Sequence, residues 1–155
     1  MANTYTQIHI HAVFAVQNRL AVIHKEWKDE LYKYISGIIK NNNHKPLCIN
    51  GMPDHIHILF GMRPSQSLSE LMQDIKADSC KWINDRNFVR EKFAWQKGYG
   101  AFTYGKSQLS HIIGYIEKQE EHHKKKTFTD EYRDILNKFE VEYDERFLFK
   151  PIQYT

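Results

Sequence analysis

The order in which the chain alternates between strand-like and helix-like hydrophobic spacing constrains its fold more than any other feature. Residues 5–16 carry an apolar side chain at every second position, which predicts a strand. Residues 26–40 carry apolar side chains at intervals of three and four, which predicts a helix that ends at Asn41. The same spacing rules predict a strand at 46–50, a turn at 51–54, a strand at 55–61, a helix at 68–84 capped by Ser67 or Ser69, a hairpin at 92–97 and 100–104, a helix at 107–124 capped by Ser107, and a last helix at 129–139.

This order, β-α-β-β-α-β(β)-α, is the split βαβ pattern of the ferredoxin-like and RRM-like α+β folds, extended by C-terminal helices. In that topology the first and third strands are central neighbours in an antiparallel sheet. We expect helices on one face of the sheet and the other face available for a ligand or a partner. The length of 155 residues fits one domain over residues 1–155.

Composition excludes some classes of protein and leaves others open. No window approaches the roughly 18 apolar residues of a membrane span, and the first ten residues lack the basic start and apolar run of a signal peptide. The two cysteines, Cys48 and Cys80, are expected to be reduced thiols in a cytoplasmic protein. The net charge of +3 and the 14% aromatic content permit contact with a nucleic acid, but on composition alone a solvated basic face and an aromatic core explain them better.

The segment His55-Ile56-His57 carries the first half of a candidate site. Alternation along a strand places His55 and His57 on the same face, roughly 7 Å apart, where two imidazoles can converge on one divalent cation. Asp54, in the preceding turn, could accept a hydrogen bond from a ring N–H and orient that ring. His9-Ile10-His11 has the same spacing but lacks the Pro-Asp turn. Pairing of the two strands would bring His11 alongside as a supporting residue.

The predicted helix at 107–124 carries the second half. Its apolar stripe is flanked by a polar stripe on which Tyr115 and Gln119 stand one turn apart. A tyrosine hydroxyl can act as a nucleophile, and a glutamine oxygen can bind a hard cation. The alternative is a tyrosine at the boundary of the core and a solvated glutamine. Gly114, inside the helix, leaves room for DNA or a partner beside Tyr115, or is neutral.

These residues resemble a known family over about residues 5 to 147. Met52-Pro53-Asp54-His55-Ile56-His57-Ile58-Leu59 is similar to the metal motif of the single-tyrosine HUH transposases of the insertion-sequence 200/605 kind, and Tyr115-Ile116-x-x-Gln119 is similar to their catalytic helix. The first strand, ending His11-Ala12-Val13-Phe14, and the stretch from Trp95 to Phe102 add to the resemblance.

The resemblance implies an activity and its components. Mg²⁺ or Mn²⁺ would be held by His55, His57 and Gln119. Tyr115 would attack a phosphodiester of single-stranded DNA, forming a 5′-phosphotyrosine and freeing a 3′-OH for later strand transfer. The enzyme would be a homodimer acting on element ends that carry hairpins, with each site either within one subunit or shared between two.

Basic residues are the candidates for DNA contact: Lys76, Lys81, Arg86, Lys106, Lys124, Lys125 and Lys126. His9, His111, His122 and His123 receive no role from the sequence. Two alternatives remain open at this stage. One is a domesticated or non-catalytic module that binds single-stranded nucleic acid through the same fold. The other is a metal-dependent enzyme of different chemistry in which Tyr115 is structural.

Overall fold

A four-stranded antiparallel sheet organises the computed structural model, which describes residues 4–148. Its strands are β1 (His9–Ala15), β2 (Lys45–Met52), β3 (His55–Gly61) and β4 (Gly100–Thr103). Their order across the sheet is β2-β3-β1-β4, so β1 and β3 are the central neighbours, as predicted. Val13 of β1 pairs with His57 of β3, which sets the register of the two histidine-bearing strands. The predicted ferredoxin-like α+β class is therefore confirmed.

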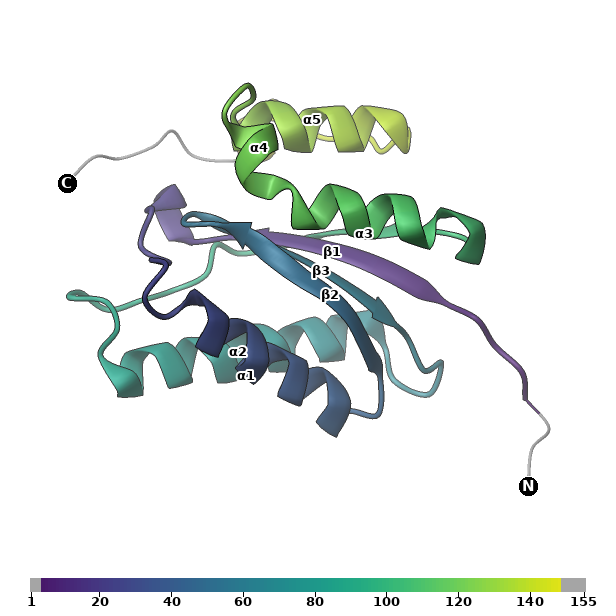
Figure 1. The fold of residues 1–155 in the computed structure, drawn as a ribbon, viewed down its shortest axis with the longest axis horizontal. Coiled ribbons are helices and arrows are strands. Elements are labelled where there is room, and N and C mark those ends of the chain that lie inside the picture. Colours follow the sequence, from purple (N-terminus) through teal and green to yellow (C-terminus); the bar gives the residue numbers. More distant parts are fainter. Residues whose placement is uncertain (1–3, 149–155) are drawn as a thin grey trace.

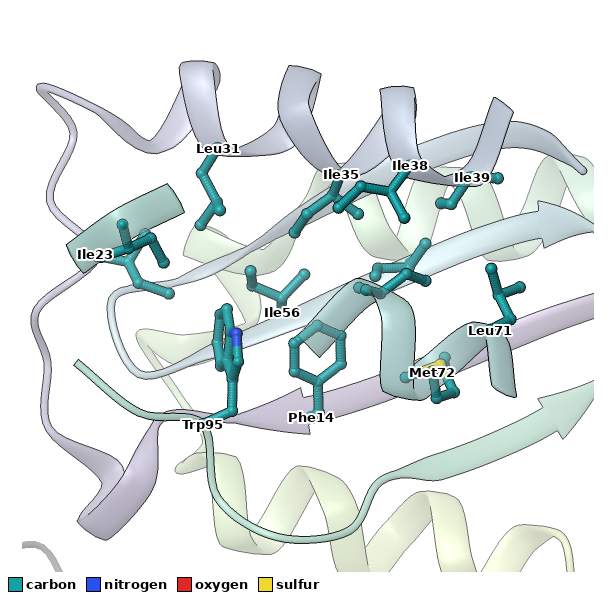
Figure 2. Packing of buried hydrophobic residues seen from close by; sticks show 14 of the residues in the cluster. Phe14, Ile23, Leu31, Ile35, Ile38, Ile39, Ile56, Leu71, Met72 and Trp95 are labelled. Atoms are coloured by element: carbon teal, nitrogen blue, oxygen red, sulfur yellow. The ribbon is translucent and has the colours of Figure 1, made fainter. Parts of the chain in front are cut away.

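Two amphipathic helices, α1 (Lys28–Asn41) and α2 (Leu68–Arg86), cover one face of the sheet. Figure 2 shows the core between them and the strands, in which Phe14 and Ile56 point from the sheet toward Leu31 and Ile35 of α1. Helix α2 begins at its predicted cap, where the Ser67 hydroxyl accepts a hydrogen bond of 3.1 Å from the backbone N–H of Glu70. This core anchors one face of β3 against α1 and α2. The alternate side chains of β3, including those of its histidines, therefore lie on the opposite face.

The opposite face is also covered, so the expectation of a free second face is wrong. Helices α3 (Leu109–Glu117), α4 (Gln119–His123) and α5 (Phe128–Lys138) lie over it (Figure 1). Leu59 of β3 packs against Ile112 and Ile116 of α3. Phe128 and Tyr132 of α5 join Val13 and Phe102 in another apolar cluster. The central strands are therefore buried on both sides, and the histidines of β3 lie beneath helices.

Three predicted elements differ in the structure. The helix expected at 107–124 starts with the 3₁₀ turn η2 (Lys106–Gln108), without a cap from Ser107, and breaks at Lys118 into α3 and α4. The first strand begins at His9. Residues 92–97 form no strand beside β4; the segment instead makes a single bridge from Trp95 to Val16. A short 3₁₀ turn, η1 (Gln17–Arg19), and a last turn, α6 (Glu145–Leu148), complete the described chain.

The turn between β2 and β3 positions the candidate site and depends on a glycine. A Cβ atom added to Gly51 would lie 2.9 Å from the Cα of Ile56 and closer still to the carbonyl oxygen of His55. Only a residue without a side chain fits this close approach of two backbones. Gly51 therefore fixes the position of β3 where it carries its first histidine.

The described helices also bear on membrane insertion. None of those in residues 4–148 combines the length and the apolar composition that crossing a bilayer requires.

Candidate metal and catalytic site

His55 and His57 lie on the helix-covered face of β3 and have no exposed surface. The Nδ1 atom of His55 lies 2.7 Å from Oδ1 of Asp54, in the preceding turn, as predicted. An ionised carboxylate only accepts hydrogen bonds, so His55 carries a proton on Nδ1. Burial favours the neutral ring, but the hydrogen bonds and charges of Asp54 and Glu131 outweigh it and raise the pKa of His55. Asp54 thus orients His55 with Nε2 toward the interior of the site.

His57 is oriented by the neighbouring strand. Its Nδ1 lies 2.8 Å from Nε2 of His11, and the two rings stack with centroids 5.1 Å apart. Burial, together with the proximity of His57, holds the pKa of His11 well below its ordinary value, so His11 is neutral. The structure therefore places His11 behind His57, where the sequence predicted a supporting residue, and leaves Nε2 of His57 facing the same point as Nε2 of His55.

Gln119, the first residue of α4 after the break at Lys118, points into this site. Gln119 has no exposed surface, and its Oε1 lies 3.1 Å from Nε2 of His55. The break frees the last carbonyls of α3, and Asn50 of β2 donates to two of them, those of Ile116 (3.0 Å) and Glu117 (3.2 Å). This bond from a strand to the end of α3 holds the helix so that Tyr115 and Gln119 both face the histidines.

Glu131 of α5 occupies the centre of the cluster and lies outside the two motifs from which the site was predicted. Its side chain is 4% exposed. Oε1 lies 3.1 Å from Nε2 of His57 and 3.1 Å from Nε2 of His123. Oε2 accepts a 3.0 Å hydrogen bond from Nε2 of Gln119 and another from the Tyr115 hydroxyl. One carboxylate therefore joins the histidines, the glutamine and the tyrosine.

A sequence signal for Glu131 does exist. Residues 128, 131, 132 and 135 fall on one side of a helix, and three of them are Phe128, Tyr132 and Ile135. A carboxylate on an otherwise apolar face needs a partner, because burying an unpaired charge is costly. Burial would raise the pKa of Glu131, but hydrogen bonds from His123, His55 and His57 hold it far below its ordinary value.

The donor atoms fit a divalent cation. One ligand atom each from His55, His57 and Glu131 can be chosen so that all lie within 4.8 Å of one another. The amide oxygen of Gln119 adjoins the same point. Two imidazole nitrogens with carboxylate and amide oxygens form a mixed donor set that suits a borderline divalent ion. All four side chains are buried, so such an ion would be shielded from bulk water.

The Tyr115 hydroxyl is held as a neutral group. Burial, then the charge and the hydrogen bond of Glu131, raise the pKa of Tyr115 above its ordinary value. The hydroxyl therefore stays protonated beside the carboxylate, and it could act as a nucleophile only after losing this proton.

The basic residues proposed for DNA contact fall into three places in the fold. Lys76, Lys81 and Arg86 belong to α2, across the sheet from the site, and Lys76 donates instead to the backbone carbonyls of Gln96 (2.7 Å) and Gly98 (2.8 Å). Lys124, Lys125 and Lys126 follow α4 directly, on the same side as Tyr115, and are exposed. Lys106 lies in η2 before α3.

Comparisons with known proteins, by sequence and by fold, point to one family. Residues 4–119 match the sequence profile of the family described as Transposase IS200 like. The chain is 27% identical over 122 residues to the ISDra2 transposase TnpA of Deinococcus radiodurans, covering 73% of this chain and 84% of that protein. It is 28% identical over 129 residues to the transposase for insertion sequence element IS200 of Salmonella typhimurium, covering 80% and 84%.

Two solved structures share the fold. A Deinococcus radiodurans protein assigned as a transposase superposes with a TM-score of 0.63 at 21% identity, over 77% of this chain and 95% of its own. The structure of the REP-associated tyrosine transposase bound to a REP hairpin superposes with a TM-score of 0.60 at 13% identity. The match covers 79% of this chain and 73% of that one.

The matched segment contains the histidines of β3, Tyr115 and Gln119, whereas α5 with Glu131 follows it. The profile spans well over half of the chain. The chain therefore belongs to the IS200-like transposase family.

Proposed function

We propose that this transposase cleaves and rejoins single-stranded DNA through a covalent link to Tyr115, with one divalent cation, Mg²⁺ or Mn²⁺, in the buried site. The observation that carries the proposal is the convergence on one point of Tyr115, Gln119 and both histidines of β3. Their sequence separation makes this arrangement a product of the fold, and each group has a role in phosphoryl transfer.

The ligands in this proposal are Nε2 of His55, Nε2 of His57 and an oxygen from Gln119, with the carboxylate of Glu131 as a further donor. When bound, such a cation polarises a non-bridging phosphate oxygen and neutralises the charge that develops on it. Asp54 and His11 hold the two rings in the required orientation from behind, through the Nδ1 atoms.

Tyr115 supplies the nucleophile. Its phenolic oxygen loses its proton and bonds to phosphorus, the bond from phosphorus to the 3′ oxygen breaks, and that oxygen takes up a proton and leaves as a 3′-OH. The number of phosphoester bonds is conserved, so rejoining requires only attack by a 3′-OH on the phosphotyrosine and no nucleotide cofactor. Glu131 holds the Tyr115 hydroxyl beside the ligands before DNA enters.

The substrate in this proposal is single-stranded DNA with hairpin ends, bound by a homodimer. One solved structure of the same fold is a tyrosine transposase bound to a REP hairpin. In this chain Lys124, Lys125 and Lys126 form an exposed basic segment next to the site, suited to a phosphate backbone.

Trapping the covalent intermediate tests the proposal. Wild-type protein would be incubated with hairpin-bearing single-stranded oligonucleotides and Mn²⁺, and the adduct mapped by mass spectrometry. We expect a DNA adduct on Tyr115 that EDTA prevents and that Tyr115→Phe abolishes while DNA binding persists. Tyr34→Phe is the matched control, because it removes a hydroxyl on α1, across the sheet from the site, and it should retain the adduct. An adduct on Tyr115→Phe protein would exclude the assigned nucleophile.

A further inference from the structure

A cavity of about 310 Å³ lies beside Tyr115, between α3, α5 and the central sheet. Its walls include the rings of Tyr104 and Phe139 and the aliphatic side chains of Ile112 and Ile135. Nothing in the proposed metal chemistry uses this space. The cavity is nevertheless continuous with the nucleophile, because Tyr115 and Glu131 form part of its lining.

Two buried imidazole nitrogens in this lining have no hydrogen-bond partner within residues 4–148. They are Nδ1 of His11 and Nε2 of His122. A buried polar atom without a partner costs free energy, and most such atoms in folded proteins are satisfied by a ligand, water or protein. Two of them in one mostly apolar cavity indicate a ligand with polar edges and a flat apolar body.

His11 presents Nδ1 to this cavity, the ring nitrogen that does not face His57. An imidazole nitrogen can donate or accept a hydrogen bond according to its tautomer, so Nδ1 can contact either kind of polar group on a ligand's edge. His122, whose ring lies 4.6 Å from that of Tyr115, offers a second polar contact.

We propose that this cavity binds one nucleobase of the DNA strand, from the nucleotide next to the phosphate that Tyr115 attacks; this rests on the proposed function. A base presents acceptors at its edge and two apolar faces, which match the imidazoles and the aromatic walls. Its neighbouring phosphate would lie toward Tyr115. Lys126 and Lys138 also line the cavity. Lys126 forms an ion pair with Asp134 of the same lining, and Lys138 adds positive charge for the strand.

The proposal assigns base preference to residues outside the matched family segment. His122, Ile135 and Phe139 all follow residue 119, where the family match ends. The cavity exists only because α5 folds back over the sheet. Relatives that lack this helix would not form the same base site.

The test is binding of the four deoxynucleoside 5′-monophosphates to the full chain, followed by ¹⁵N NMR of the histidine rings, with deoxyribose 5-phosphate as the probe without a base. We expect at least one nucleotide to shift the ring nitrogens of His11 and His122, whereas the sugar phosphate does not. His122→Phe keeps the ring and removes both nitrogens, so binding should weaken about fivefold, the effect of one hydrogen bond. His24→Phe, the same change at an exposed histidine away from the cavity, should leave affinity unchanged.

Three results would overturn the proposal: nucleotides that shift neither ring, equal affinity for deoxyribose 5-phosphate, or equal losses in the two histidine variants. The wild-type NMR measurement stands even if His122→Phe fails to fold. Failure of the proposed function is separate, because it appears as the absence of a Tyr115 adduct in wild-type protein. An adduct without a nucleotide-induced shift removes only the base site, whereas a shift without an adduct supports the base site and removes the phosphotyrosine chemistry.

Discussion

The hydroxyl of Tyr115 donates a hydrogen bond to the carboxylate of Glu131, which reaches it from a helix beyond the family-matched segment. The other carboxylate oxygen lies 3.1 Å from Nε2 of His57. The proposed nucleophile and a proposed metal ligand are therefore linked through a single side chain. This link makes Glu131 the residue whose substitution most directly tests how the site is built.

Replacing Glu131 with glutamine should weaken metal binding while preserving side-chain volume. We expect the affinity for Mn²⁺, measured by electron paramagnetic resonance, to fall at least about tenfold, the lower limit for groups that merely orient ligands. Glu120→Gln, at a side chain that is 55% exposed, serves as the matched control and should bind as wild type does. Unchanged or tighter binding by the Glu131 variant would show that the carboxylate competes with the cation instead of holding it.

Asp54 should influence the affinity of the site for a divalent cation indirectly, by orienting His55. Asp54→Asn removes the charge 2.7 Å from Nδ1 of His55, while its amide oxygen can still accept the hydrogen bond. We expect a loss of about tenfold in Mn²⁺ affinity, near the lower limit for such orienting partners. Asp85→Asn, an exposed site on α2, is the control. Equal Mn²⁺ affinities in these two variants would mean that the charge of Asp54 matters only for its ion pair with Arg19.

The pH dependence of stability should reveal the buried, neutral His11. Its pKa in the folded protein is lowered by burial and by His57, so the unfolded chain takes up a proton there that the folded chain resists. The neutral His11 therefore contributes to the free energy of unfolding above the pKa of a histidine in the unfolded chain, about 6.5. This contribution to stability is lost as the pH falls below that pKa. His57, whose pKa burial also lowers, acts in the same direction, and His55, whose pKa is raised, opposes them.

His11→Phe should therefore flatten the loss of stability in acid. Denaturant unfolding in EDTA would measure the change, which is limited to about 1.4 kcal/mol per pH unit for one proton. His24→Phe removes an exposed histidine, and the slope of its unfolding free energy against pH should match that of the wild type. A His11→Phe slope identical to wild type would indicate that the imidazole is protonated in the folded state.

Lysines near Tyr115, and not those on α2, should bind DNA. Changing Lys124 and Lys125 to glutamine should weaken binding of single-stranded DNA and lower the slope of log affinity against log salt by up to about 1.4, since each phosphate contact contributes roughly 0.7. Changing Lys81 and Arg86 to glutamine removes the same charge across the sheet and should alter neither value. Fluorescence anisotropy at several salt concentrations measures both. The reverse pattern would place the DNA on the α1 and α2 side.

Gly51→Ala should destabilise the protein and disturb the metal site together. The added methyl group meets the backbone of His55 and Ile56, and overpacking of this kind typically costs about 1–3 kcal/mol. Calorimetry should show a lower unfolding temperature. Gly37→Ala, inside α1 with no atom within 4 Å of the new Cβ, should be neutral or stabilising. A fully stable Gly51→Ala protein would mean that the turn can relax without moving β3.

The site was predictable from sequence where short-range periodicity determines it. His55 and His57 share a face because strand side chains alternate, and Tyr115 and Gln119 face one way because they are four residues apart. Helical periodicity indicates that Glu131 is buried, but not its role, which depends on how the loop after α4 returns α5 across the sheet. The covering of the second sheet face by α3, α4 and α5 was not predicted either. Histidines at positions 9 and 11 of β1 resemble the polar side of a half-exposed strand, and only the long-range packing of these helices buries that side.

The break at Lys118 has a consequence for how closely the nucleophile is tied to the cation. In an unbroken helix the pitch alone would set the offset between Tyr115 and Gln119. Here the two belong to separate helical segments, and the side chain of Asn50 bonds to the last carbonyls of the first segment, α3. A substitution at Lys118 or Asn50 can therefore change the distance between the Tyr115 hydroxyl and Gln119 while both of these residues stay the same.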